Sequence, residues 1–177
     1  SMAITTNAAY IFIPMDESQS DHLKAYGIAY YAIERDVKVD WLLNYQGGSF
    51  MMKQHHDLEN ECNIRGETFN IIADIQSTQI LQSITSPSIN QDVVRLEKAP
   101  KIAIYSPSNK QPWDDAVTMA LTYAEIPYEV IYDEEVLSNL LPLYDWLHLH
   151  HEDFTGQYGK FYVSFRNATW YKEQKRD

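Results

Sequence analysis

Short apolar runs alternate with amphipathic segments along most of the chain. The runs are rich in β-branched and aromatic residues and predict strands, over residues 10–14, 37–43, 68–72, 101–105, 128–132 and 144–149. Apolar positions at helical spacing predict helices over residues 23–33, 56–65 and 74–84, after Pro112, and as a short turn over 133–137. Ser18 and Ser20 are candidate N-caps of the first helix, and Gly66 is expected to end the second.

Strands that alternate with helices favour right-handed crossovers and a parallel sheet. We therefore predict an α/β fold with a mostly parallel sheet and flanking helices, flavodoxin-like or Rossmann-like, in two consecutive βαβ modules. The predicted boundaries are a lead-in over 1–9 that begins with an expression-tag remnant, a βαβαβα module over 10–86, a proline-containing linker over 87–100, and a truncated βαβ module over 101–177.

Composition narrows the classes of partner. The formal net charge is -11 and the sequence pI is near 4.9, which disfavours binding to nucleic acid or to an anionic membrane surface. Apolar runs all fall well short of the roughly 20 residues that cross a bilayer, so we expect no membrane insertion. The one cysteine, Cys62, excludes an intrachain disulfide.

Ligands of open parallel sheets bind beyond the carboxyl ends of the strands, and this rule selects four loops. The candidate site residues come from these loops. The candidates for catalysis are Asp16, Glu17, His150, His151 and Glu152. The candidates for ligand binding are Gly47, Gly48, Ser106, Trp113, His148 and Asp153.

The densest of these clusters is the segment 148–153, which combines imidazoles with carboxylates. Such a set could bind zinc or another divalent cation, supply a general base with an orienting acid, or simply end a strand. No established metal-binding spacing such as H-E-x-x-H is present, so we assign no metal ligands and leave the cofactor open.

The other candidates have simpler structural interpretations. Gly47 and Gly48 lack the pattern of a phosphate-binding loop and are best explained by a turn that needs positive φ. Asp114 and Asp115 fit the first turn of a helix, where acids interact favourably with the helix dipole. Cys62 lies within a predicted helix rather than on a nucleophile elbow, and no complete nucleophilic triad is evident.

Several stretches resemble a bacterial family named asparagine synthetase B. They are Ile13-Pro-Met-Asp-Glu-Ser-Gln19, His22-Leu-Lys-Ala-Tyr-Gly-Ile28, Val39-Asp-Trp-Leu-Leu-Asn-Tyr45, Gly47-Gly-Ser-Phe50, Lys101-Ile-Ala-Ile-Tyr-Ser-Pro107, Pro112-Trp-Asp-Asp-Ala-Val117 and Tyr144-Asp-Trp-Leu-His-Leu-His-His-Glu-Asp-Phe-Thr-Gly156. The resemblance runs from about Tyr10 to Trp170 and covers the N-terminal part of longer proteins. Authentic asparagine synthetase B carries an N-terminal catalytic cysteine and an ATP-pyrophosphatase motif, and neither occurs in these residues.

The resemblance implies a class I glutamine amidotransferase-like α/β domain whose nucleophile is supplied by residues beyond Asp177. Whether the chain itself is an enzyme stays open, and the alternative is a non-catalytic module that binds a small molecule, a sugar or a peptide. The resemblance and the polar lead-in also favour export to the periplasm or beyond, with a cytoplasmic location as the other option. A homodimer, or contact with a missing C-terminal part, is a further expectation.

Overall fold

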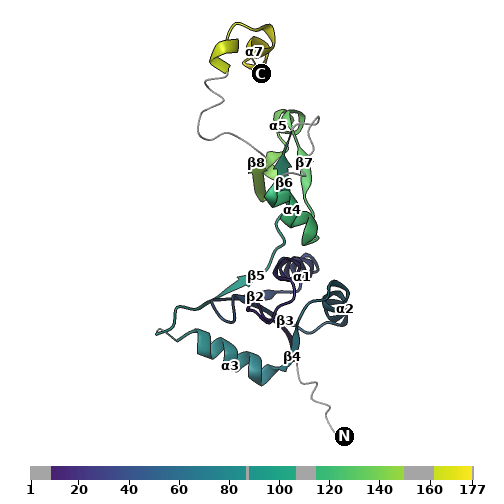
Figure 1. The fold of residues 1–177 in the computed structure, drawn as a ribbon, viewed down its shortest axis with the longest axis vertical. Coiled ribbons are helices and arrows are strands. Elements are labelled where there is room, and N and C mark those ends of the chain that lie inside the picture. Colours follow the sequence, from purple (N-terminus) through teal and green to yellow (C-terminus); the bar gives the residue numbers. More distant parts are fainter. Residues whose placement is uncertain (1–8, 87, 107–114, 150–161, 177) are drawn as a thin grey trace.

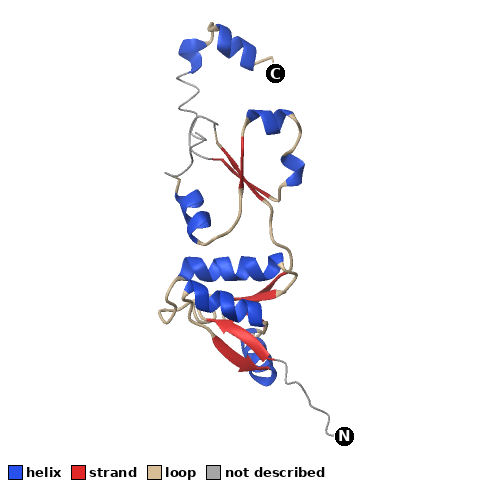
Figure 2. Ribbon diagram, turned by 90° about the vertical axis from the view of Figure 1, so that its right-hand side faces the viewer, coloured by secondary structure: helices blue, strands red, loops and turns tan. Residues whose placement is uncertain are grey.

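The computed structural model describes residues 9–86, 88–106, 115–149 and 162–176. Its first part is a five-stranded sheet with helices on both faces, followed by a three-stranded sheet with helices of its own (Figures 1 and 2). The first sheet contains β1 (Ala9–Ile13), β2 (Val39–Leu43), β3 (Ser49–Lys53), β4 (Asn70–Ala73) and β5 (Asp92–Leu96). Its helices are α1 (His22–Glu34), α2 (His56–Arg65) and α3 (Asp74–Ile84).

The first sheet is antiparallel, so the prediction of a mostly parallel, flavodoxin-like or Rossmann-like sheet is wrong. Its strand order is β4-β1-β3-β2-β5, and every pairing between neighbours is antiparallel. Two strands that the sequence pattern did not predict cause the difference. Strand β3 pairs with both β1 and β2, and β5 lies within the predicted linker and pairs with β2. In the first predicted module, β1 and β2 do run parallel and are joined by α1, but the antiparallel β3 lies between them, so they do not pair.

A tight reversal between β2 and β3 sets this antiparallel arrangement. Asn44, Gln46, Gly47 and Gly48 all have positive φ, at 60°, 44°, 79° and 93°. Such a run of left-handed residues turns the chain back on itself, whereas a crossover helix would have carried it to a parallel neighbour. The segment that follows, Ser49–Lys53, has no β-branched residue, which is why the pattern did not predict a strand there.

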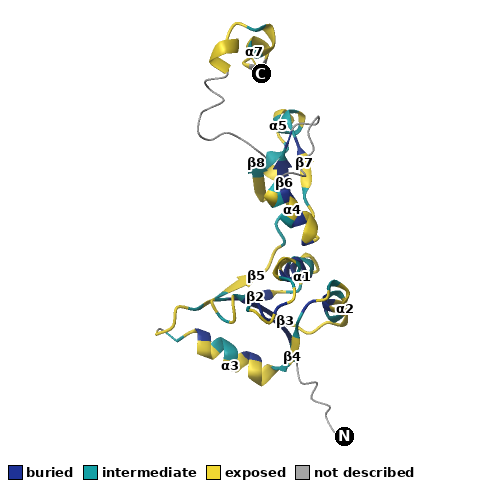
Figure 3. Ribbon diagram, viewed as in Figure 1, coloured by how far each residue is buried: buried dark blue, intermediate teal, exposed yellow. Residues whose placement is uncertain are grey.

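Both faces of the first sheet are covered, which explains the uninterrupted apolar character of β1. Ile11 and Ile13 pack on the side of α1 and α2, and Phe12 points to the opposite side, toward α3. Figure 1 shows α1 and α2 on one side of the sheet and α3 on the other, and Figure 3 shows the buried residues gathered along the strands and α1. Phe50 is 1% exposed and contacts the rings of Tyr26 and Trp41.

Local signals fix the ends of the helices on this sheet. Asp21 caps α1, because its side chain accepts a hydrogen bond from the Lys24 amide, so Ser18 and Ser20 are not the cap. Gly66 ends α2 with φ 75° in the left-handed region, as its position predicted.

The second sheet is small and parallel. It contains β6 (Ile102–Tyr105), β7 (Glu129–Ile131) and β8 (Trp146–Leu149) in the order β7-β6-β8. The connections carry α4 (Ala116–Tyr123), α5 (Asp133–Leu137) and the 3-10 turn η1 (Leu141–Leu143). Ile102, Ile104 and Leu121 form its buried core. The last helix described is α7 (Thr169–Gln174).

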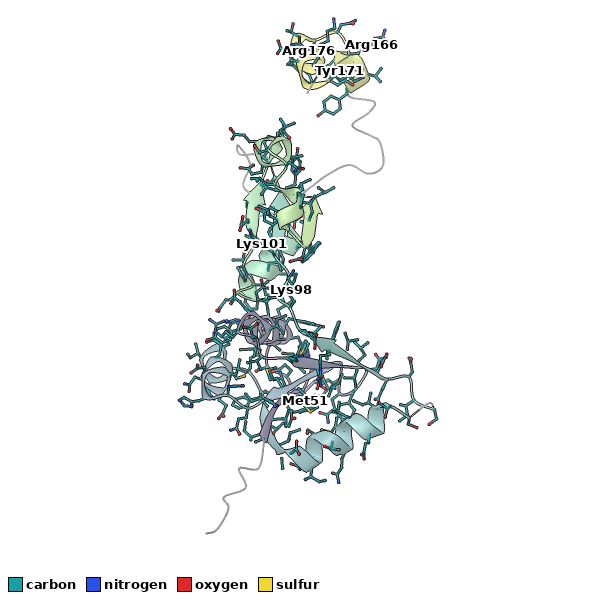
Figure 4. The ribbon with its side chains drawn as sticks, turned by 180° about the vertical axis from the view of Figure 1, so that it is seen from behind. Met51, Lys98, Lys101, Arg166, Tyr171 and Arg176 are labelled. Atoms are coloured by element: carbon teal, nitrogen blue, oxygen red, sulfur yellow. The ribbon has the colours of Figure 1, made fainter. Side chains whose placement is uncertain are left out.

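The two sheets meet through α1 and α4. Gly27 on α1 lies so close to the end of α4 that an added Cβ would stand 1.8 Å from the Ala124 carbonyl oxygen. Arg65 donates to that same oxygen at 3.0 Å, and the Tyr123 hydroxyl donates to the Asp21 carboxylate. On the connection itself, where Figure 4 labels Lys98 and Lys101, the Asp145 carboxylate accepts from the Lys98 ammonium and the Lys101 amide. Small residues and polar contacts therefore join the two sheets.

Within the described residues, no helix has both the length and the apolar character needed to cross a membrane.

Candidate functional site

The first predicted site loop follows β1 and is held together by its own hydrogen bonds. The Asp16 carboxylate accepts from the Ser18 amide at 3.0 Å and from the Ser18 hydroxyl at 2.6 Å. These bonds to Ser18 lower the pKa of Asp16. Glu17 is exposed beside it. The carboxylate of Asp16 thus serves a local turn of the Asx type.

The glycine loop packs directly against this turn. The Met15 amide donates to the Gln46 carbonyl oxygen at 2.9 Å, and a Cβ on Gly47 would lie 2.1 Å from the Met15 carbonyl oxygen. His22, which the sequence did not single out, braces the same turn, because its Nε2 lies 3.1 Å from the carbonyl oxygens of both Met15 and Asp16. Gly48 accepts from the Trp41 indole at 3.0 Å. Asp16, Gly47 and Gly48 therefore lie together, but their polar groups hold two turns against each other.

The second predicted loop cluster lies at the carboxyl end of the parallel sheet, where His148 pairs with Asp115. Parallel pairing of β6 and β8 places His148 beside Ile104. The imidazole Nε2 is 3.1 Å from each oxygen of the Asp115 carboxylate. The side chains of His148 and Asp115 are only 20% and 13% exposed, so the contact is largely shielded from solvent.

Asp115 has a second role as the N-cap of α4. Its Oδ1 accepts from the amides of Val117 and Thr118 at 2.8 and 3.0 Å. A carboxylate that accepts two backbone N–H bonds is fixed in place. The expectation that Asp115 is a helix-start acid therefore describes only half of what this residue does.

The contacts of Asp115 also determine the tautomer of His148. An ionised carboxylate only accepts hydrogen bonds, so Nε2 of the imidazole must carry the hydrogen. In the neutral ring the basic lone pair is then on Nδ1. A histidine oriented in this way by a carboxylate is the usual arrangement of a general base.

The position of this pair in the sheet is the one where ligands bind in parallel α/β folds. The chain leaves the central strand β6 toward β7 and returns on the other side as β8, so the direction of the connections reverses between β6 and β8. A crevice opens at such a switch point, beyond the carboxyl ends of the two strands. His148 comes from β8, and Asp115 begins the helix that follows β6.

Further polar groups lie at the same edge. Ser106 directly follows β6, is buried, and donates its backbone amide to the Ile131 carbonyl oxygen at 2.9 Å. The Tyr105 hydroxyl donates to the Asp133 carboxylate at 2.5 Å. Tyr105 and Asp133 were missed by sequence reasoning, although each stands at a predicted strand end, where the same rule could have selected them.

The structure separates the predicted candidates into two groups. Asp16, Glu17, Gly47 and Gly48 belong to the antiparallel sheet, whereas Ser106 and His148 belong to the parallel one. Asp115 lies at the start of α4, near the second group, and Tyr123, the last residue of α4, contacts Asp21 on the antiparallel sheet. The length of α4, about 12 Å, therefore separates the two groups. Trp113, His150, His151, Glu152 and Asp153 lie outside the described residues.

Comparison with known proteins adds no relationship. No protein-family model matches the chain, and neither the curated proteins nor the solved structures contain a significant match.

The described part of the chain also contains no group of three or more histidine, cysteine or carboxylate side chains placed to hold a metal ion.

Proposed function

We propose that the carboxyl edge of β6 and β8 is the acid–base part of a site that acts on a small amide, in a class I glutamine amidotransferase-like protein. The observation that carries this proposal is the 3.1 Å contact between His148 and Asp115 at the switch point of the parallel sheet.

The pair supports general acid–base chemistry. His148 would take a proton at Nδ1 from an attacking group and later return it to the leaving amine. Asp115 would hold the ring in its Nε2–H form and stabilise the imidazolium, while the amides of Val117 and Thr118 keep the carboxylate still. Asp115 is therefore a positioning residue, and His148 is the residue that would meet the substrate.

The choice of an amide substrate comes from the sequence resemblance. Two of the stretches that resemble the bacterial family named asparagine synthetase B, residues 112–117 and 144–156, contain Asp115 and His148. Glutamine amidotransfer requires the amide C–N bond to break, with a proton delivered to the leaving nitrogen so that it departs as ammonia, and an oriented histidine can supply that proton.

Cys62 cannot be the nucleophile of such a reaction. This thiol is 0% exposed on α2, and burial, followed by the nearby carboxylates of Glu67 and Glu61, raises its pKa to about 12. A thiolate does not form under such conditions at neutral pH. We therefore expect the attacking group outside the described residues, in agreement with the resemblance.

Ammonia release from L-glutamine, measured with the full-length protein as well as with this chain, tests the proposal. The variant His148→Gln should lower kcat by about 100-fold or more, the usual contribution of a general base. Asp115→Asn is the sharper variant, because asparagine caps a helix as well as aspartate and removes only the charge. It should lower kcat with little change in KM or in the melting temperature.

His56→Gln provides the matched control, since His56 is an exposed histidine at the start of α2. It should release ammonia at the wild-type rate. An absence of ammonia release from glutamine, asparagine and simple amides by the full-length protein, as well as by this chain, would overturn the proposal. If glutamine raised the melting temperature without any turnover, the site would be a binding module for small molecules instead.

A further inference from the structure

A cavity on the antiparallel sheet, far from the His148 pair, has an unusual concentration of positive charge. Its volume is about 420 Å³, within the range of small-ligand sites. Residues 9–100 contain seven lysine and arginine side chains in all. Four of them line this one cavity, namely Arg35, Lys38, Lys53 and Arg95. Two carboxylates, Asp36 and Asp40, line it as well, so the cavity carries an excess of positive charge in a chain whose net charge is -11.

The register of the sheet explains how the cations come together. Tyr10 on β1 pairs with Lys53 on β3, and Asp40 on β2 pairs with Arg95 on β5. Continuing the β2–β3 register by one residue from the Val39–Met52 pair places Lys38 opposite Lys53. Like charges directly opposite each other destabilise a sheet, unless something negative lies between them.

Acidic partners neutralise only part of this charge. Arg95 makes a two-pronged pair with the largely buried Asp40, at 2.8 and 3.1 Å through Nε and Nη2. Lys38 pairs with Glu97 at 2.7 Å, and Arg35 pairs with Glu34 at 3.0 Å. Among the described residues, the Nη1 group of Arg95 makes no hydrogen bond, and the Lys53 ammonium has no ion-pair partner. Asp40 is thus the group that holds the Arg95 guanidinium in one orientation.

We propose that this cavity binds a small molecule bearing a carboxylate or phosphate group, held by Lys53 and the Nη1 side of Arg95. The two groups provide an ammonium and a guanidinium, which are the donors that oxyanions prefer. Tyr10 and Val37 line the same cavity and would contact the apolar part of the ligand. The site is distinct from the acid–base pair, so it does not depend on the function proposed above.

Calorimetric titration of the purified protein with inorganic phosphate, and separately with succinate, tests the inference. We expect saturable binding of at least one probe, weaker at about 150 mM salt than at about 20 mM because the contacts are ionic. Lys53→Met should weaken that binding by about tenfold, the usual loss for one hydrogen bond from a charged donor. The preference between the two probes identifies the oxyanion.

Lys98→Met is the matched control, because it makes the same change of charge at an exposed lysine outside the cavity. Its affinity should stay within about twofold of the wild type. Arg95→Lys keeps a positive partner for Asp40 but removes the guanidinium, including the Nη1 group proposed to bind the anion, so it should also weaken binding. Absence of binding by both probes, or equal losses in Lys53→Met and Lys98→Met, would overturn the inference.

Discussion

Replacing Glu67 by glutamine tests the most unusual buried charge of the protein. Glu67 follows the Gly66 cap of α2, and only 6% of its surface is exposed. Both of its carboxylate oxygens are buried without a hydrogen-bond partner in the described part of the chain. Burial, and then the charge of Asp21, raise its pKa from 4.5 to about 7, against the opposing effect of Lys24, His22 and Arg65.

The sign of the effect on stability follows from the two pKa values. In the unfolded chain Glu67 loses its proton near pH 4.5, whereas in the folded protein it keeps the proton until about pH 7. Between these values the folded state binds more protons, so the free energy of unfolding falls as the pH rises. The stabilisation is complete below about pH 4.5 and lost above about pH 7, and it amounts to about 3 kcal/mol in total.

Urea denaturation at pH values from about 5 to about 8, followed by tryptophan fluorescence, measures this dependence. Glu67→Gln has nearly the same shape but cannot titrate, so its unfolding free energy should lack the Glu67 part of the decline. Between about pH 5 and about pH 8, the unfolding free energy of the variant should rise by about 2–3 kcal/mol relative to that of the wild type. Glu17→Gln, at an exposed position, is the control and should keep the wild-type slope. Parallel curves for the wild type and Glu67→Gln would refute the reasoning.

Three further predictions concern packing. Gly47→Ala should destabilise the protein by about 2 kcal/mol or more in urea denaturation, because φ is +79° and the Met15 carbonyl oxygen occupies the space of the new methyl group. Gly27→Ala should push α1 away from Ala124, so the backbone amides of α4 should exchange hydrogen faster while those of β1 stay protected. Unchanged protection of the α4 amides would contradict the close approach of the two helices. Phe50→Ala should cost about 3–5 kcal/mol of unfolding free energy, and a loss below about 1 kcal/mol would show that the ring is not a core element.

The histidine tautomer offers an independent check of the proposed acid–base pair. Long-range ¹H–¹⁵N correlation spectra should show His148 protonated at Nε2 in its neutral form, and Asp115→Asn should reduce that preference. A neutral ring with its hydrogen on Nδ1 would be incompatible with the contact to the Asp115 carboxylate.

Local periodicity in the sequence was enough to place most of the elements. The strand at Ala9–Ile13, the helix at His22–Glu34 and the glycine end of α2 all follow from patterns within a few residues. The same is true of β6, β7 and β8, whose apolar runs are short and well bounded. These features depend on backbone propensity and on which faces are apolar, both of which can be read along the chain.

Only the tertiary structure decided how the strands pair and which side chains meet. A strand buried on both faces has the same apolar pattern in a parallel and in an antiparallel sheet, so β1 could not reveal that its neighbours run the other way. The turn over Asn44 to Gly48 and the unpredicted strands β3 and β5 determined that direction. In the same way, Asp115 and His148 are 33 residues apart in sequence, and they meet because β6 and β8 pair side by side.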